Sequence, residues 1–125
     1  MHQDQTTRRK ALVVEDEPAI SRACQKVLTA EGFDVDVAMN GFIAMKMVNE
    51  KTYDLCLSDI KIPGMGGIEL FNKLKEHHSD LINTFIFMSG DILGGSTAHF
   101  LEEVKKPFLA KPFSPDELRN VLRLY

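Results

Sequence analysis

Short apolar runs alternate with helix-forming segments along this 125-residue chain. Most runs are continuous in Val, Leu, Ile and Phe, as in strands of a parallel sheet that helices cover on both faces. The run "DVDVA" alternates with period two, which indicates a strand with one wetter side. The expected strands are 11–14, 34–38, 55–58, 84–89 and 108–110, and the expected helices begin near residues 18, 41, 67, 96 and 115.

Five strand–helix units joined by right-handed crossovers leave few topologies. We predict an α/β fold, a flavodoxin-like doubly wound sheet of five parallel strands in the order 2-1-3-4-5, with five helices. The clearest helix start is "SPDEL", where Ser114 can cap, Pro115 takes the first helical position and Glu117 can complete a capping box. Ligands of such sheets bind beyond the carboxyl ends of the strands, where the strand order reverses.

Polar residues follow the expected strands at that edge. They are Glu15 and Asp16 after the first strand, Asp59 after the third, Ser89 after the fourth and Lys111 after the fifth. Two carboxylates about 4 Å apart repel by roughly 4 kcal/mol at an effective dielectric of about 20. Three acids held together at this edge would therefore take up protons or recruit a cation. Mg²⁺ suits oxygen ligands and often binds phosphate at the same time. These residue types together indicate a site for a phosphoryl group.

Four motifs in this order carry a resemblance to a known family: "LVVEDEP", "DLCLSDIKIPGMGG", "FIFMSGD" and "FLAKPFSPDEL". The chain resembles the receiver domain of bacterial two-component response regulators from Lys10 to Tyr125. We therefore expect a receiver domain over residues 10–125, preceded by a polar lead-in over residues 1–9.

The resemblance implies a role for each acidic position. Asp59 would be the phosphoacceptor, taking its phosphoryl group from a phosphohistidine on a sensor histidine kinase or a histidine phosphotransfer protein. The Mg²⁺ ligands would be Asp16, Asp59 and the backbone carbonyl of Lys61, with Glu15 acting through water. The domain would thus be a phosphorylatable switch in a phosphorelay and not an enzyme, although its full-length protein could be a hybrid histidine kinase.

The resemblance also implies a switch. Lys111 and Ser89 would bind phosphoryl oxygens beside Gly90, and Pro112 would follow a cis peptide bond. Phe108 would rotate into space that Ser89 vacates, which alters the surface formed by the fourth helix, the fifth strand and the fifth helix.

Several residues depart from the family pattern. Phe108 lacks the hydroxyl of the more familiar Tyr, and Gly90 replaces a frequent Ala. Lys61 places a cation beside the phosphate, where Asp91 could pair with it, at positions that tune dephosphorylation in the family. The segment "FLEEVKKPFLAKPF" is similar to receivers of hybrid sensor histidine kinases.

Two other functions stay open at this point. An aspartyl-phosphate phosphatase needs Asp-x-Asp after its first strand and usually a cap insertion, whereas this chain has Glu-Asp-Glu and no room for a cap. A degenerate receiver would serve only as a docking scaffold, and the intact acidic, Ser and Lys positions argue against it.

The net charge, the length of the apolar runs and the cysteine positions restrict the partners and the cellular compartment that we expect. A net charge of −3 favours neither nucleic acid nor an anionic membrane, and no apolar run approaches the roughly 20 residues of a membrane span. Cys24 and Cys56 fall within apolar patterns, as buried thiols of a reducing compartment do, and the polar N-terminus does not resemble a secretory signal. We expect a cytoplasmic domain without direct nucleic-acid or membrane contact. A receiver–receiver dimer, and the choice between a stand-alone receiver and a piece of a longer protein, stay open.

Overall fold

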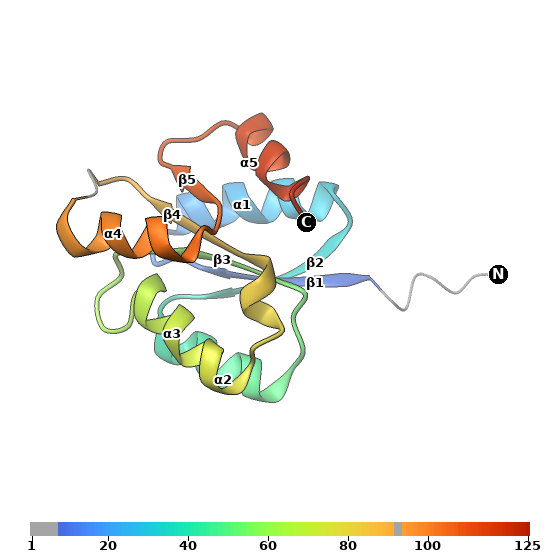
Figure 1. Cartoon of the computed structure of the whole chain (residues 1–125). Helices are drawn as coiled ribbons and strands as arrows, with labels where there is room; N and C mark the ends of the chain where they lie inside the picture. Colours follow the sequence, from blue (N-terminus) through green and yellow to red (C-terminus); the bar gives the residue numbers. More distant parts are fainter. Residues whose placement is uncertain (1–7, 92–93) are drawn as a thin grey trace.

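The computed structural model describes residues 8–91 and 94–125 as a parallel sheet between two layers of helices (Figure 1). Its strands are β1 (Arg9–Val14), β2 (Phe33–Ala38), β3 (Leu55–Asp59), β4 (Phe85–Ser89) and β5 (Phe108–Ala110). Its α-helices are α1 (Pro18–Ala30), α2 (Gly41–Glu50), α3 (Gly67–His77), α4 (Gly95–Val104) and α5 (Pro115–Leu122), and a 3₁₀ turn, η2, spans Leu81–Thr84.

The sheet has the strand order β2-β1-β3-β4-β5 with every neighbouring pair parallel, which confirms the predicted topology. In β1, Ala11 is in register with Val35 of β2 and Leu55 of β3. Because all strands run the same way, their carboxyl ends meet at one edge of the sheet. That edge therefore receives the polar residues that follow each apolar run.

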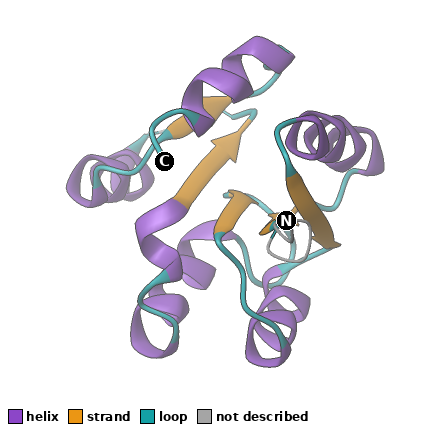
Figure 2. Ribbon diagram, turned by 90° about the vertical axis from the view of Figure 1, so that its right-hand side faces the viewer, coloured by secondary structure: helices purple, strands orange, loops and turns teal. Residues whose placement is uncertain are grey.

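Successive side chains of each strand enter opposite helical layers, as the two-residue period requires. Helices α1 and α5 cover one face, where Leu28 and Leu118 pack against Ala11, Val13 and Leu57. Helices α2, α3 and α4 cover the other face, as Figures 1 and 2 show. The continuous apolar runs are thus buried on both sides, which is why they read as unbroken hydrophobic sequence.

A cluster of aromatic rings fills the layer under α3 and α4. The Phe71 ring of α3 lies edge-on to Phe85, with centroids 5.2 Å apart, and also contacts Phe87. Helix α4 joins the cluster through Phe100, whose centroid is 5.8 Å from those of Phe71 and Phe87. No side chain of α4 is fully buried, so this ring and its half-buried neighbours attach the helix.

Several element bounds differ from the prediction by one or two residues, including the start of β2 at Phe33 and the end of β3 at Asp59, and two of the differences have tertiary reasons. Strand β1 begins at Arg9, not at residue 11, because Arg9 stacks over the Phe33 ring at 4.9 Å and Arg8 pairs with Asp34 of β2. Strand β4 begins at Phe85, because Thr84 completes η2, where its hydroxyl donates to the carbonyl of Leu81. The predicted lead-in lies largely outside the described residues.

Other local predictions are met by direct contacts. Ser114 Oγ accepts from Glu117 N at 3.1 Å and Ser114 N donates to Glu117 Oε1 at 2.8 Å, so the capping box of α5 forms as predicted. Cys24 and Cys56 are buried free thiols, and burial raises the pKa of Cys24 to about 12. Within residues 8–91 and 94–125, no helix has the length and apolar content needed to cross a membrane.

Candidate functional site

Lys111 joins two buried carboxylates at the carboxyl edge of the sheet. Its Nζ lies 2.7 Å from Asp59 Oδ2, at the end of β3, and 2.7 Å from Glu15 Oε1, just past β1. Asp59 and Glu15 are only 5% and 1% exposed. Removing a charged group from water costs free energy, and the charge is kept only where a partner compensates it. Lys111 and the two carboxylates therefore depend on one another for their burial.

Asp16 completes an acidic cluster with these two residues. One carboxylate oxygen from each of Glu15, Asp16 and Asp59 lies within 4.8 Å of the others. Within the described part of the chain, Glu15 Oε1 is a buried oxygen without a hydrogen bond of good geometry, although Lys111 Nζ is 2.7 Å away. A set of hard oxygen donors with one unsatisfied member fits Mg²⁺, which binds carboxylates and keeps several waters. The residues present therefore fit the predicted metal.

Burial dominates the ionisation of Glu15. Desolvation raises its pKa, the nearby Lys111 ammonium and the Glu17 backbone N–H lower it, and the charge of Asp59 raises it again, with a net rise. For Lys111, burial lowers the pKa, but the contacts with Asp59 and Glu15 outweigh it and the net pKa is raised. Lys111 is therefore a permanent cation between the two acids.

The loop after β3 holds Asp59 in place through its backbone. Lys61 N donates to Asp59 Oδ1 at 3.2 Å, so the residue whose carbonyl is expected to ligate the metal also orients the carboxylate. The loop folds tightly against itself at Gly66, where a Cβ would stand 2.1 Å from the Ile60 carbonyl oxygen. Only glycine fits there, which explains one of the glycines that follow Pro63.

Ser89 ends β4 beside this loop. It is 2% exposed, its backbone carbonyl accepts from Lys111 N at 2.9 Å, and its Oγ accepts from Asp91 N at 3.2 Å. Gly90 faces the Lys111 stem, where an added Cβ would make an ordinary contact at 3.6 Å. Above them Lys61 Nζ lies 3.3 Å from Asp91 Oδ2, the pair that the sequence suggested. The β3–α3 and β4–α4 loops are thus linked across the site.

The expected switch positions lie next to this group. Phe108 starts β5 in register with Phe87 and is half-buried, packed on the core cluster under α3 and α4. The Lys111–Pro112 peptide bond is cis. The structure thus brings Glu15, Asp16, Asp59, Ser89 and Lys111 to one edge, with Phe108 on the adjoining strand.

The family model for the response regulator receiver domain matches residues 11–123. The chain belongs to this family. It is a receiver domain of two-component systems, and members of the family are phosphorylatable switches that interact with histidine kinases or phosphotransfer proteins.

Curated relatives of this receiver domain include transcriptional regulators and a phosphotransferase. The transcriptional regulatory protein ResD of Bacillus subtilis is 35% identical over 121 residues, which cover 97% of this chain and 48% of ResD. Sporulation initiation phosphotransferase F of the same species is 31% identical over 120 residues, covering 93% of this chain and 92% of that protein. The chain spans about half the length of most of the curated relatives it matches.

Solved structures share the fold of this receiver domain. The response regulator protein TrrA of Thermotoga maritima, in complex with Mg²⁺ and BeF, has a TM-score of 0.79 and 28% identity, covering 93% of this chain and 97% of that one. A CheY-like receiver domain from Methanospirillum hungatei has a TM-score of 0.83 at 24% identity, covering 94% and 92%.

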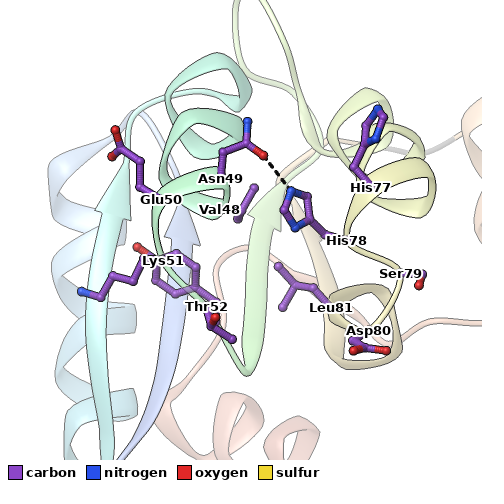
Figure 3. A pocket seen from close by; sticks show the side chains of 11 residues that line it. Val48, Asn49, Glu50, Lys51, Thr52, His77, His78, Ser79, Asp80 and Leu81 are labelled. Carbon is purple, nitrogen blue, oxygen red and sulfur yellow. Dashed lines mark hydrogen bonds between the residues drawn. The ribbon is translucent and has the colours of Figure 1, made fainter.

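A cavity of about 520 Å³ lies at the opposite edge of the receiver domain, away from the acidic cluster. It is lined by the ends of α2 and α3 and by the residues before β3 and η2, and His78 Nε2 lies 2.8 Å from Asn49 Oδ1 across it (Figure 3). Since β3 and β4 begin at this edge and end at the other, the cavity does not adjoin Asp59.

Two features of the receiver domain were not found from the sequence. The backbone N–H of Glu17 donates to Glu15 Oε2 at 3.1 Å and so orients that carboxylate. Phe42 and Ile43, at the start of α2, are exposed although they lie in an apolar segment. The signal for Phe42 was present, since it does not fall on the helical stripe of Ala44, Met47 and Val48, whereas Ile43 lies one turn before Met47.

Proposed function

We propose that Asp59 of this receiver domain accepts a phosphoryl group from a phosphohistidine on a sensor histidine kinase or a histidine phosphotransfer protein. The single observation that carries the proposal is the buried Asp59 carboxylate, held at 2.7 Å from Lys111 beside two further acids. The Mg²⁺–BeF complex of the relative TrrA agrees with this chemistry.

In the reaction, a carboxylate oxygen of Asp59 forms a bond to phosphorus while the phosphorus–nitrogen bond of the phosphohistidine breaks. The imidazole nitrogen leaves with the electron pair, and because the other ring nitrogen carries a proton, the leaving group is the neutral imidazole. The product is an acyl phosphate, a mixed anhydride that water can hydrolyse back to the free carboxylate. Asp59 is therefore a reversible acceptor.

The other residues of the site stabilise charge. The Lys111 ammonium faces the position where phosphoryl oxygens gather and neutralises part of their charge in a loose transition state. The Ser89 hydroxyl, now an acceptor from Asp91 N, can rotate to donate to a phosphoryl oxygen. Gly90 leaves room beside the Lys111 stem.

Glu15, Asp16, Asp59 and the backbone carbonyl of Lys61 would hold Mg²⁺, with Glu15 reaching it through water. When bound, the ion supplies positive charge next to the phosphoryl oxygens and offsets repulsion among the carboxylates. Glu15 is pre-oriented for this role by the N–H of Glu17.

Phosphorylation would then change the surface of α4, β5 and α5. Movement of Ser89 toward the phosphoryl group would leave space for the half-buried Phe108 ring to turn inward. A change from 1% to 99% of the switched state requires about 5.5 kcal/mol of differential affinity. Helix α4 has no fully buried side chain to resist such a rearrangement.

The functional unit of the proposal is residues 10–125, acting in the cytoplasm without direct contact to nucleic acid or membrane. Two observations support this setting: Cys24 and Cys56 are buried free thiols, as in reducing compartments, and the formal net charge is −3.

Intact-mass measurement tests the chemistry. Incubation with phosphoramidate and Mg²⁺ should add the mass of one phosphoryl group, and the variant Asp59→Asn should gain none. Asp80→Asn, an exposed acid before η2, is the matched control and should be modified like the wild type.

Each rival function gives a different result in this experiment. A docking scaffold would gain no mass, and a phosphatase would release phosphate from an added phosphate ester in a reaction that Asp59→Asn abolishes. Modification at another residue would contradict the assignment of Asp59.

A further inference from the structure

Three large apolar side chains are exposed together at the start of α2. Among residues 8–91 and 94–125, the large hydrophobic side chains with high exposure are Met39 (56%), Phe42 (59%), Ile43 (42%) and, elsewhere, Leu124 (67%). Met39, Phe42 and Ile43, here called the apolar rim, fall within five consecutive positions. Single exposed apolar residues need no explanation, whereas a cluster marks an interaction surface.

The backbone holds the apolar rim in a fixed position. Asn40 caps α2, accepting from Ile43 N at 2.9 Å, and Gly41 N donates to the Met65 carbonyl at 2.8 Å. At Gly41 a Cβ would stand 2.6 Å from Met65 Cγ, so the two loops pack too closely for any side chain there. The rim is therefore attached to the β3–α3 loop.

Phe42 also contacts that loop directly. Its ring lies beside Gly64, which has φ of +91°, and a Cβ at Gly64 would approach the ring to 3.1 Å. One face of the ring thus has a support while much of the side chain stays in solvent. A rigid, partly supported aromatic side chain is the kind of anchor that dominates protein interfaces.

The apolar rim lies at the same edge of the sheet as Asp59. It begins directly after Ala38, the last residue of β2, whose carbonyl accepts from Glu15 N at 3.0 Å. The loop that the rim contacts, residues 60–66, begins directly after Asp59. The rim is therefore continuous with the site through both neighbouring loops.

We propose that the apolar rim is a docking surface for the protein that delivers the phosphoryl group, namely the apolar face of the helix that carries the phosphohistidine. The inference rests on the proposed function. Asp59 is only 5% exposed, and the donor imidazole must bring its phosphorus to roughly 3–3.5 Å from the carboxylate. A donor helix that does so covers the edge of the sheet, where the rim offers it apolar contact.

Two phosphodonors separate docking from chemistry. Phosphoramidate needs no docking surface, so Phe42→Ala and Ile43→Ala should be phosphorylated by it at the wild-type rate. The second donor is a panel of helical-bundle histidine phosphotransfer proteins, each phosphorylated on its histidine, from which the fastest donor to the wild type is taken. With that donor Phe42→Ala should slow phosphotransfer at least about tenfold, the loss typical of a central aromatic anchor. Leu124→Ala, which removes an equally exposed apolar side chain elsewhere, should transfer at the wild-type rate.

The outcomes distinguish failure of each proposal. Loss of the phosphoramidate reaction in the wild type would overturn the proposed function itself. If phosphoramidate works but the rim variants accept from the protein donor as fast as Leu124→Ala does, or no donor of the panel transfers to the wild type, the docking proposal is wrong. A wild-type dimer in analytical ultracentrifugation that Phe42→Ala dissociates would assign the rim to a second copy of this chain and overturn the proposal as well.

Discussion

Replacing Lys111 by Met removes a cation that contacts both Glu15 and Asp59 while keeping an apolar stem of similar length. Each carboxylate lies 2.7 Å from Lys111 Nζ, a separation worth about 6 kcal/mol of attraction at an effective dielectric of about 20, before the desolvation of the charges is subtracted. Removing one member of a buried ion pair costs about 3–5 kcal/mol in practice. We expect Lys111→Met to lower the free energy of unfolding by about 3 kcal/mol without divalent ions, at the low end because Glu15 can take up a proton.

The assay is urea unfolding followed by circular dichroism, once in chelator and once in excess Mg²⁺. With Lys111 absent, the acids have a stronger need for a cation, so Mg²⁺ should stabilise Lys111→Met by at least about 1 kcal/mol more than the wild type. The control Lys73→Met, on the exposed surface of α3, should stay within about 0.5 kcal/mol of the wild type.

A loss below about 1 kcal/mol for Lys111→Met in chelator would refute the view that Lys111 neutralises a buried acidic site. Equal stabilisation of the wild type and the variant by Mg²⁺ would refute the view that the ion and Lys111 compensate the same charges. The double variant with Asp59→Asn adds a further check, because removing one acid should recover part of the loss.

Three further perturbations test local features. Gly66→Ala would force a Cβ to 2.1 Å from the Ile60 carbonyl and should cost roughly 1–3 kcal/mol in urea unfolding, whereas Gly90→Ala, with an ordinary contact at 3.6 Å, should be nearly neutral. Ser114→Ala removes the capping box of α5 and should cost about 1 kcal/mol, seen as a lower Tm in calorimetry; an unchanged Tm would mean that the cap contributes nothing. Hydrogen bonds from a lysine and a tyrosine lower the pKa of Asp36, so its stabilising effect is present above the unfolded pKa of about 4 and is lost as the pH falls through the folded pKa. Asp36→Asn should therefore be less stable than the wild type at pH 7, with a difference that shrinks on acidification; a constant difference would contradict this account.

The sequence predicted the sheet and the site edge because both depend on one-dimensional signals. Strands buried on both faces read as continuous apolar runs, and Asp59 and Lys111 each follow such a run directly. Parallel strand direction then brings these residues together without any knowledge of side-chain contacts. The acidic cluster therefore follows from the parallel direction of the strands and from the polar residues that stand at their carboxyl ends.

The parts that sequence reasoning missed depend on contacts between distant segments. The early start of β1 requires Arg9 to meet the Phe33 ring, and no local pattern states that two such residues become neighbours. Likewise, the sequence places Phe42 off the buried stripe of α2, but no local pattern states that its ring comes to lie beside Gly64 of the β3–α3 loop. At these positions the structure is determined by contacts between distant segments and not by local sequence preference.

The weak attachment of α4 has a consequence for how the domain can transmit a change. Helix α1 buries Cys24, Val27 and Leu28 completely or nearly so, and its displacement would expose all of that surface to water. Helix α4 contributes no comparable side chain, so a small shift of it against the sheet uncovers little apolar area and costs correspondingly little free energy. The domain thus combines tightly packed helices such as α1 with one loosely attached helix, α4, which directly precedes β5 in the chain.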